Sequence, residues 1–585
     1  MDPTPEALAA HSFEYDPSAL DKPLAEFLQR FYTFSDDKQN ANSWAECFAG
    51  DGVMKKAATN VQGRDKIAEV NLGSWKGQAS KKHTVFKVFP FSPGNASEVM
   101  LHGQSNYVYD DGTTGEMGWA ARLHFQRFDD GRILIDTYHI FPSPVDQSHI
   151  NLQGGWPTPR LHPVEALESA SAAVFRQNDI NKQLLYDPEL GSTSLRESIG
   201  KWLNDFYAPS AGSIPSERIV ITNGASNGLA TILQKFTDPS TRAVWMVEPT
   251  YFLACPILRD AGLMARIRGA PEGEDGVDLD FLAKALQEVD DEWPVDASLP
   301  PRKLAKAGYP KIYKHVIYLI PTFSNPSGKT MGIENRRKLV QLARKHDALI
   351  VTDDVYDMLR WYADDNGDTS SGEIPQCQPR IVDVDRDMEG ATVFGNSVSN
   401  GSFSKIVAPG MRVGWLEGTP DFVAAMGTVG ASVSGGCQSH FASLVIDRML
   451  QNGVMTTHIN DCLIPVYRER YHALTNAIKR CLYPLGARLV AENSDSNVAG
   501  GFFLYVSFGK LTGAEIAQVA LQHSNLKIAP GSIFAVPDDP SSITRGETSY
   551  FNGARLCWAW HEKEELVEGI ERLAAAIRRI GETRE

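Results

Sequence analysis

Three short apolar runs in the middle of the chain each end in a cluster of polar and small residues. Each run, together with its cluster, spans residues 219–228, 316–328 or 348–356. A short apolar run bounded by turn residues is typical of a buried strand. Open α/β sheets bind their ligands at the carboxyl ends of such strands. The pattern therefore predicts an α/β sheet with a ligand site along the edge where these strands end.

A fourth segment carries Lys405, with Ser402 and Ser404 before it and Arg412 after it. A neutral amine can form a Schiff base with an aldehyde, while hydroxyls and a guanidinium can bind a phosphate dianion. These residues suit a cofactor that has both an aldehyde and a phosphate. For this segment alone, a solvated lysine in a Ser/Gly-rich loop is the simpler interpretation.

The first three segments offer groups that complement Lys405. Asp353 follows a buried strand, and a carboxylate there can keep a pyridine nitrogen protonated. Asn325 offers an amide to a phenolic oxygen, and residues 222–228 form a turn before a helix, the usual phosphate cradle of backbone N–H groups. Each segment alone could be a simple turn or strand end. Four of them in one chain favour a shared site.

Residues from about 150 to 585 resemble the class I/II aminotransferases, which are fold-type I enzymes dependent on pyridoxal 5′-phosphate (PLP). Within that family they resemble the aminoadipate and kynurenine aminotransferase branch. The resemblance implies an α/β large domain, about 185–450, with a mainly parallel seven-stranded sheet. It also implies a small α/β domain, built from residues 150–184 and 451–585. Residues 290–314 and 362–388 are rich in turn-forming residues and are predicted to be surface insertions.

The resemblance implies a role for each catalytic position. Lys405 corresponds to the lysine that forms the Schiff base and moves the α-proton, and Asp353 to the partner of the pyridine nitrogen. Tyr356 and Asn325 correspond to the groups that bond the 3′-oxygen of the ring. Tyr251 corresponds to the aromatic residue that stacks on the ring.

The resemblance also implies a phosphate site and a substrate site in a homodimer. Arg555 should bind the α-carboxylate, because its planar fork matches a planar anion. Gly155, Trp156 and Asn325 should line the substrate pocket. The phosphate ligands are expected to be Ala225, Ser226, Asn227, Ser402, Ser404 and Arg412 of one chain, and Tyr186 of the neighbouring chain.

The cofactor motifs specify the reaction less sharply than the cofactor. We predict an aminotransferase of secondary metabolism that exchanges an amino group between an amino acid and a 2-oxo acid. The alternative is a PLP-dependent synthase or lyase of a biosynthetic pathway. A regulatory protein that binds PLP without turnover is disfavoured by the intact catalytic positions. Trp156 favours aromatic or long apolar substrates, unless it only packs the N-terminal arm, and related aminoadipate enzymes accept dicarboxylates.

The composition indicates an enzyme of a reducing compartment. The net charge of −15 argues against a nucleic-acid or anionic-membrane partner. The seven cysteines are scattered without a C-x-x-C pair, which argues against a disulfide framework or a metal site. No signal peptide or 18-residue apolar stretch is apparent. We therefore predict a cytoplasmic protein that binds no metal, membrane or nucleic acid.

Residues 1–145 are predicted to form a separate α+β domain. Leu24, Phe27, Leu28 and Phe31 have the spacing of an amphipathic helix after Pro23. Turn-rich segments follow at 48–53 and 61–67. Strand-like runs then span 84–89, 97–109, 117–128 and 133–141, with two Asp-Asp-Gly hairpin turns between the last three. This order resembles the NTF2-like/SnoaL-like family, a curved sheet wrapped around helices to form a conical pocket.

The role of this first domain is left open by its polar residues. His83, His102, His124 and His139 lie on or beside the predicted strands, and Asp136 is near the last of them. Successive side chains of a strand point to opposite faces of the sheet, so about half of these polar residues would point away from the pocket. The same alternation prevents Asp136 and His139, three residues apart, from facing one pocket. Binding or scaffolding is therefore favoured over catalysis, and the domain could bind or cyclise a product.

Overall fold

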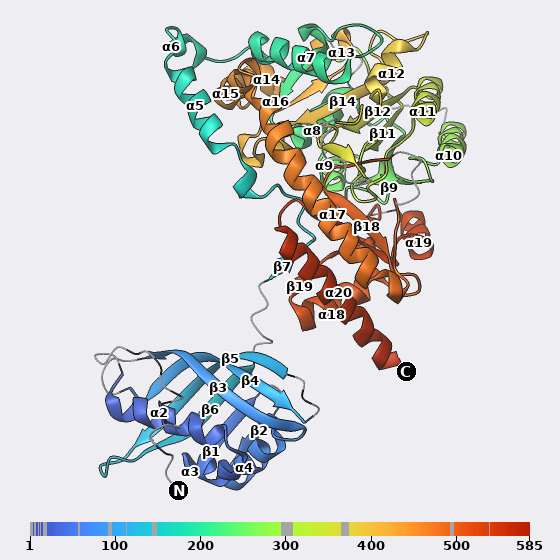
Figure 1. The fold of residues 1–585 in the computed structure, drawn as a ribbon. Helices are drawn as coiled ribbons and strands as arrows, with labels where there is room; N and C mark the ends of the chain where they lie inside the picture. Colours follow the sequence, from blue (N-terminus) through green and yellow to red (C-terminus); the bar gives the residue numbers. More distant parts are fainter. Residues whose placement is uncertain are drawn as a thin grey trace. The chain divides into compact units, whose positions relative to one another are not determined.

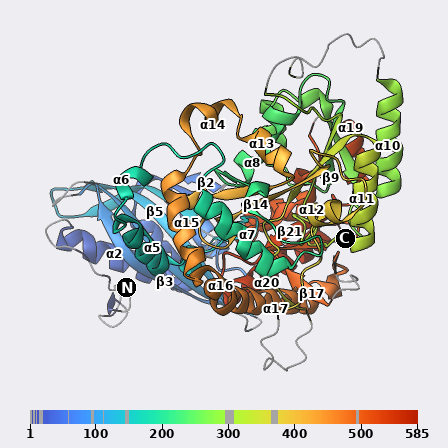
Figure 2. The same ribbon diagram turned by 90° about the horizontal axis from the view of Figure 1, so that it is seen from above.

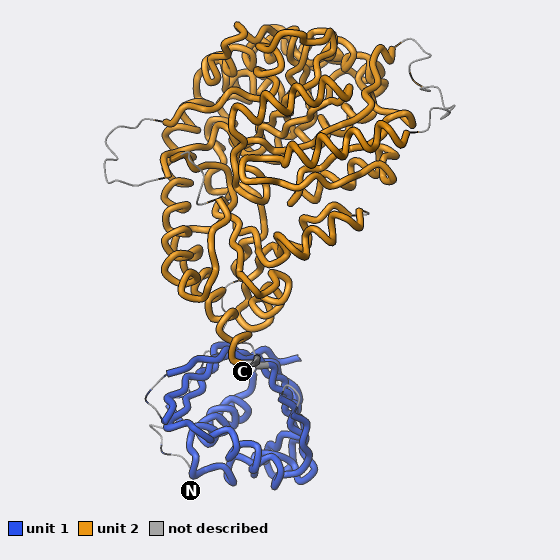
Figure 3. The backbone as a smooth tube through the Cα atoms, turned by 90° about the vertical axis from the view of Figure 1, so that its right-hand side faces the viewer, with its two compact units in different colours: residues 1–148 blue, residues 149–585 orange. Residues whose placement is uncertain are grey.

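The computed structural model divides the chain into two compact units (Figure 3): an N-terminal unit, residues 1–148, and a C-terminal unit, residues 149–585. The sequence places the boundary at residue 145, and the predicted linker at 143–148 lies outside the described residues. The structure describes residues 4, 8, 9, 11, 13, 15, 20–56, 59–91, 96–110, 112, 114–142, 149–293, 303, 308–363, 374–491, 497–537 and 539–584. None of the helices in these ranges combines the length and apolar character needed to cross a membrane.

The N-terminal unit contains a six-stranded sheet in the order β2-β1-β6-β5-β4-β3. The strands are β1 (Phe48–Lys56), β2 (Thr59–Gln62), β3 (Gln78–Pro90), β4 (Glu98–Tyr109), β5 (Thr114–Arg127) and β6 (Ile133–Pro142). The antiparallel pairing of β4 with β5 and of β5 with β6 confirms the two predicted hairpins. The prediction of a turn at residues 48–53 is wrong, because β1 pairs in parallel with β6 and antiparallel with β2.

Three helices cover one face of this sheet: α2 (Lys22–Ser35), α3 (Ala41–Glu46) and α4 (Arg64–Gly73). Helix α2 begins after Asp21, whose side chain caps the helix by accepting a 3.0 Å hydrogen bond from the Leu24 N–H. The predicted apolar stripe of α2 is fully buried, as are alternate residues of β4 and β5. The helices and the inner face of the sheet therefore share one apolar core.

The C-terminal unit is built on a seven-stranded sheet in the order β10-β9-β11-β12-β14-β15-β8 (Figure 1). The strands are β8 (Ile219–Thr222), β9 (Ala243–Glu248), β10 (Ile267–Pro271), β11 (His315–Leu319), β12 (Ala348–Asp353), β14 (Ser397–Ser402) and β15 (Gly414–Glu417). Only β15 runs antiparallel to its neighbours. The mainly parallel, seven-stranded sheet is as predicted.

Helices cover both faces of this sheet (Figures 1 and 2). Helices α8 (Ala225–Phe236), α9 (Ala254–Asp260) and α13 (Pro420–Met426) share a core with Val244 and Met246 of β9. Helices α10 (Leu279–Glu292), α11 (Ile333–Lys345) and α12 (Ile381–Asp387) share another core with Trp245 of the same strand. Because successive residues of a buried strand face opposite layers, such strands are apolar throughout.

A second, antiparallel sheet of four strands follows in the order β16-β18-β21-β20. Its strands are β16 (Arg488–Leu489), β18 (Phe503–Ser507), β20 (Ala529–Pro530) and β21 (Gly553–Cys557), and they are accompanied by α17 (Ile464–Cys481), α18 (Gly513–Ser524) and α20 (Lys563–Arg584). The short strand β7 (Ile150–Asn151) pairs with β19 (Leu526–Lys527). This pairing joins the start of the unit to its C-terminal part.

The described residues test the two predicted surface insertions, 290–314 and 362–388, only in part. Most of 294–307 and all of 364–373 lie outside the described residues. The remainder of the second segment contradicts the prediction, because α12 is largely buried. Arg380 just before it forms buried salt bridges with Asp383, at 2.9 Å, and with Glu417 of β15, at 2.7 Å. These ion pairs hold α12 against the main sheet.

Candidate active site

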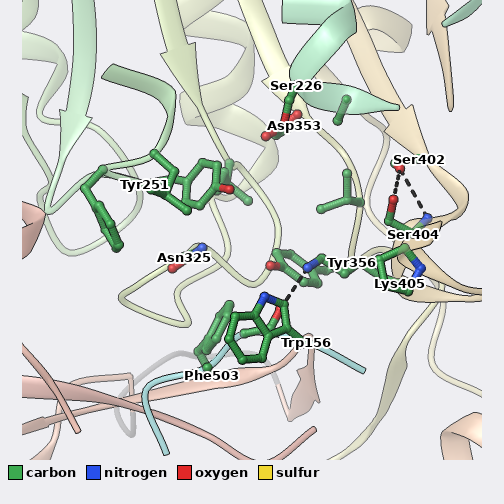
Figure 4. A pocket seen from close by; sticks show the side chains of 18 of the residues that line it. Trp156, Ser226, Tyr251, Asn325, Asp353, Tyr356, Ser402, Ser404, Lys405 and Phe503 are labelled. Atoms are coloured by element: carbon green, nitrogen blue, oxygen red, sulfur yellow. Dashed lines mark hydrogen bonds between the residues drawn. The ribbon is translucent and has the colours of Figure 1, made fainter. Parts of the chain in front are cut away.

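A cavity of about 310 Å³ lies where the strands of the main sheet end. Figure 4 shows Ser226 and Asp353 on one side of it, Trp156 and Phe503 on the opposite side, and Tyr356 between them. The described lining residues that carry polar or aromatic side chains are Asn151, Gln153, Trp156, Ser226, Tyr251, Phe252, Asn325, Asp353, Tyr356, Ser402, Ser404, Lys405, Arg412, Phe503, Lys527 and Arg555. The cavity therefore gathers nearly all the residues singled out in the sequence.

Each of these residues reaches the cavity because of its place in the fold. Asp353 is the last residue of β12, Ser402 the last of β14, and Asn325 follows β11. Gly155 and Trp156 come from the arm that starts the unit, and Arg555 comes from β21 of the second sheet. Segments far apart in sequence therefore meet at the carboxyl edge of the main sheet, as expected for an open α/β fold.

The Lys405 amine is buried and lightly restrained. Its Nζ donates one 2.9 Å hydrogen bond to the Gly155 carbonyl and lies 5.4 Å from the centre of the Phe502 ring. Burial lowers the pKa of this amine to about 8, and the Arg555 charge acts in the same direction. A substantial fraction of the amine is therefore neutral near pH 8, which is the form that reacts with an aldehyde.

The Asp353 carboxylate is held by two groups that the sequence did not indicate. Tyr318 donates its hydroxyl to one oxygen at 2.7 Å, and Asn400 donates its side-chain N–H to the other at 2.8 Å. Burial raises the pKa of Asp353 to about 6, whereas these hydrogen bonds oppose that shift. The pair therefore keeps a buried carboxylate oriented toward the cavity and ionised at neutral pH.

An anion cradle lies beside Lys405 at the N-terminus of α8. Ser226 lies in the first turn of that helix, where backbone N–H groups are unpaired. The Ser402 hydroxyl donates to Ser404 at 3.0 Å, and the Arg412 guanidinium donates to Ser404 at 3.3 Å. Gly224 has a φ of +81°, and a Cβ there would clash with the Arg412 guanidinium. Glycine at this position therefore lets the arginine close over the turn.

Arg555 forms the opposite end of the polar lining. Its guanidinium donates to the Asn325 side chain at 2.6 Å and to the Gln153 carbonyl at 2.5 Å. The Phe503 ring lies 4.1 Å below it. Its Nε is buried and has no hydrogen-bond partner among the described residues. An orphaned N–H on a buried, rigidly held guanidinium is a ready donor for a carboxylate.

Two residues predicted for this site lie outside the cavity lining. Asn227 instead accepts a 3.4 Å hydrogen bond from the Asn223 backbone N–H and so closes the turn before α8. Tyr186 is 87% exposed and lines a different surface pocket, formed by residues between 177 and 194 and between 440 and 451. Within one chain, therefore, neither side chain contributes to the cavity.

The donor set of the cavity fits PLP. An amine with a lowered pKa, a buried carboxylate and an anion cradle match the aldehyde, the pyridine nitrogen and the phosphate of that cofactor. Tyr251, which lies in the same lining, offers an aromatic face.

Comparisons with known proteins agree with this chemistry. Residues 155–573 match the family described as aminotransferase class I and II. An uncharacterised protein of Saccharomyces cerevisiae is 33% identical over 73% of this chain and 97% of its own length. The aromatic-amino-acid aminotransferase 1 of Thermococcus litoralis is 27% identical over 73% of this chain and 88% of its own length. The crystal structure of the multiple substrate aminotransferase of Thermococcus profundus has a TM-score of 0.58 at 25% identity, covering 75% of this chain and 94% of that chain.

The fold and the cavity define a fold-type I PLP enzyme. The chain belongs to the aminotransferase class I and II family, which matches most of its length. It is therefore a PLP-dependent aminotransferase, with an amino acid and a 2-oxo acid as substrates. The predicted cofactor and reaction are confirmed. The match begins at residue 155, so the N-terminal unit is outside it.

Proposed function

We propose that the enzyme transfers the amino group of aromatic or long apolar 2-amino acids, in secondary metabolism. The observation that carries this proposal is the lining opposite Asp353, which contains Trp156 and Phe503 (Figure 4). Phe252 also belongs to the cavity lining. Aromatic side chains bind apolar groups by area and ring geometry. The Thermococcus litoralis relative is named for aromatic amino acids, which supports the same substrate class.

Each residue of the cavity has a proposed task. When bound, PLP supplies an aldehyde that condenses with amines and a ring that withdraws electrons. The Lys405 Nζ would hold the aldehyde of the cofactor, and the same amine would take up the α-proton of the amino acid. Asp353 holds a proton on the ring nitrogen, while Tyr356 and Asn325 bond the 3′-oxygen. Arg555 binds the α-carboxylate of the substrate.

The remaining groups hold the cofactor in place. Tyr251 stacks on the ring, and the phosphate is bound by the first turn of α8. Ser402, Ser404 and Arg412 complete the phosphate site through the hydrogen bonds that already join them. The Asn227 side chain supports this site by ordering the turn rather than by touching the phosphate.

A screen of the twenty amino acids against 2-oxoglutarate tests the substrate class. We expect the highest kcat/KM with aromatic or long apolar amino acids, and Trp156→Ala should lower it about 10- to 100-fold for these substrates alone. Trp560→Ala is the matched control, because its ring lies 6.0 Å from that of Trp156 but outside the cavity lining. If Trp156 only packs the arm, the two variants will act alike.

Two results would overturn this substrate class. One is activity confined to aspartate and glutamate and unchanged in Trp156→Ala, which would direct attention to the exposed Lys527 in the lining. The other is silence with every amino acid, which would show that the amino donor lies outside these twenty. For an accepted amino acid, pyridoxamine phosphate should accumulate when the amino acid is added without oxo acid.

We propose further that the active unit is a homodimer in which Tyr186 completes the phosphate site of the neighbouring chain. Tyr186 belongs to a group of exposed apolar side chains on and after α5 (Val164–Phe175) and at the start of α15 (His440–Gln451). The group consists of Val164, Phe175, Leu184, Leu185, Tyr186 and Phe441. Within this group, the rings of Phe175 and Phe441 lie 5.2 Å apart. Exposed apolar side chains that gather on neighbouring elements are typical of a subunit interface.

Mixing two defective variants tests this arrangement. Tyr186→Phe should weaken PLP binding about tenfold by removing one hydrogen bond to a charged group, and Lys405→Ala should be inactive. In a hybrid dimer, the Tyr186→Phe chain keeps Lys405 and receives an intact Tyr186 from its partner. At a PLP concentration too low to load the Tyr186→Phe homodimer, random mixing should therefore restore about a quarter of the sites. A fully active monomer in sedimentation, or no recovery on mixing, would contradict the shared site.

For the N-terminal unit we propose an NTF2-like/SnoaL-like roll. What supports this is a six-stranded sheet whose inner face packs on three helices. Of the polar residues considered in the sequence, His83 lines the cavity of this unit. His124 instead bonds Asp136 at 2.7 Å in a partly buried pair, and His102 lies against the ring of Phe86.

A further inference from the structure

The N-terminal unit encloses a cavity that is separate from the aminotransferase site. Its volume is about 490 Å³, within the range of small-molecule sites. The cavity lies between the helices and the inner face of the sheet, with Trp44 of α3 and Trp119 of β5 among its walls. Tyr107, Tyr109 and Tyr138 add further aromatic surface. The size and the walls suit a planar, largely apolar ligand.

Two ammonium groups line this cavity without forming a salt bridge to a described carboxylate. Lys81 is 8% exposed, makes long hydrogen bonds of 3.3 Å to Ser74 and 3.5 Å to Asn71, and lies 4.5 Å from the centre of the Trp75 ring. Lys56 lines the same cavity. Within the described part of the chain, no salt bridge joins either lysine to a carboxylate. Glu116, the acidic residue of the lining, is exposed.

Burial and mutual repulsion act on these lysines. Burial lowers the pKa of Lys81 to about 8, and the Lys56 charge acts in the same direction, whereas Asp36 opposes them. Asp36 is itself paired with His83, and it also lies 3.5 Å from His11. Lys81 is buried and Lys56 is partly buried. A bound anion stabilises a buried cation that a nearby like charge repels.

Further donors around the cavity are unsatisfied. The indole Nε1 atoms of Trp44 and Trp119 and the amide nitrogen of Asn71 are buried and have no hydrogen-bond partner among the described residues. Gln78 contributes one orphaned buried acceptor, its Oε1. Buried polar atoms of native proteins are normally paired. Because these unpaired atoms are covered by neighbouring groups, Lys81 and Lys56 remain the cationic donors that line the cavity.

We propose that the N-terminal unit binds a small aromatic carboxylate in this cavity. Lys81 and Lys56 bind the carboxylate, and Trp44 and Trp119 contact the ring. A carboxylate supplies two acceptor oxygens and the negative charge that the lysines lack. This site is independent of the substrate proposed for the C-terminal unit.

Calorimetry on the full-length, PLP-loaded protein tests the charge of the ligand with three probes of one shape. These are phenylacetate, 2-phenylethanol and 2-phenylethylamine. The titrations use the Arg555→Ala variant, so that carboxylate binding in the aminotransferase cavity is suppressed. We expect one phenylacetate per chain and at least tenfold weaker binding of the alcohol and the amine. Absence of binding, or equal affinity for all three probes, would overturn the proposal.

A pair of neighbouring lysines tests the location. In the same background, Lys81→Met should weaken phenylacetate binding at least tenfold. Lys82→Met should leave it unchanged, because Lys82 is the next residue of β3 and is exposed. Undiminished binding in Lys81→Met would place the ligand elsewhere and refute this site. Lys81→Met could also weaken binding by destabilising the fold, which a lower unfolding temperature would reveal. In that case the three probes, titrated into the Arg555→Ala variant with Lys81 intact, decide whether the cavity selects a carboxylate.

Discussion

Lys405→Ala is expected to abolish transamination, with a loss of at least about 10³-fold in kcat. The lysine amine is the group in the cavity that can both bind an aldehyde and move the α-proton, so its removal disables two steps together. Its single hydrogen bond goes to the Gly155 carbonyl, and its removal should leave the chain folded. The measurements are turnover, far-ultraviolet circular dichroism and covalent attachment of PLP, trapped with borohydride and located by peptide mass spectrometry.

Two controls make this result specific to the amine. Lys345→Ala removes an exposed lysine at the end of α11 and should leave turnover and PLP attachment unchanged. Adding methylamine to Lys405→Ala should restore part of the proton transfer, because a small amine can enter the space left by the side chain. Normal turnover of Lys405→Ala would refute the assigned chemistry altogether.

The carboxyl edge of the main sheet was predictable because its signals are local. A buried parallel strand must be apolar along its whole length, and the turn that follows must contain small or polar residues. Residues 219–228, 316–328 and 348–356 show both features within about ten residues each. The same is true of the stripe on α2, where the helical period alone identifies the buried face.

The support around Asp353 was not predictable in this way. Tyr318 is 35 residues from Asp353 and Asn400 is 47 residues from it. Both reach it only because β11 and β14 lie on either side of β12. The available signal was an asparagine in the middle of a buried strand, since such an amide needs a partner. The sheet order that supplies this partner is a tertiary property.

Errors in the N-terminal unit have a similar origin. Glycines at residues 50 and 52 suggested a turn, but the long-range partner β6 makes this segment a strand. The strand predicted from residue 84 in fact begins at Gln78. Lys81 and His83 therefore fell outside the predicted strand. The prediction thus missed that both side chains line the inner face of the sheet. These two residues line the cavity that now distinguishes this unit.

Asp353→Asn is expected to lower kcat at least about 100-fold, which is the usual cost of removing one preorganised charge from an active site. Asparagine keeps the size of the side chain but cannot hold a proton on the ring nitrogen by charge. Asp354→Asn is the matched control. Asp354 is equally buried and its pKa is likewise raised to about 6, but it bonds Thr352 and Ser399 and does not line the cavity. That variant should keep most of its activity.

The pH dependence of PLP binding separates the charge of Asp353 from its shape. Burial raises the pKa of Asp353 to about 6, so the carboxylate is lost as the pH falls through 6. Binding of PLP to the cofactor-free protein should therefore weaken from pH 7 to pH 5, although the phosphate also titrates near pH 6. The free energy of unfolding of the cofactor-free protein should change in the opposite sense and rise as the pH falls from 7 to 5. A raised carboxyl pKa means that the charged form destabilises the folded state above pH 6, and protonation relieves this cost. Asp353→Asn should retain the contributions of the phosphate and of the Lys405 amine to binding, so its profile should be flatter than that of the native chain. Identical profiles for the two proteins would show that Asp353 does not act through its charge.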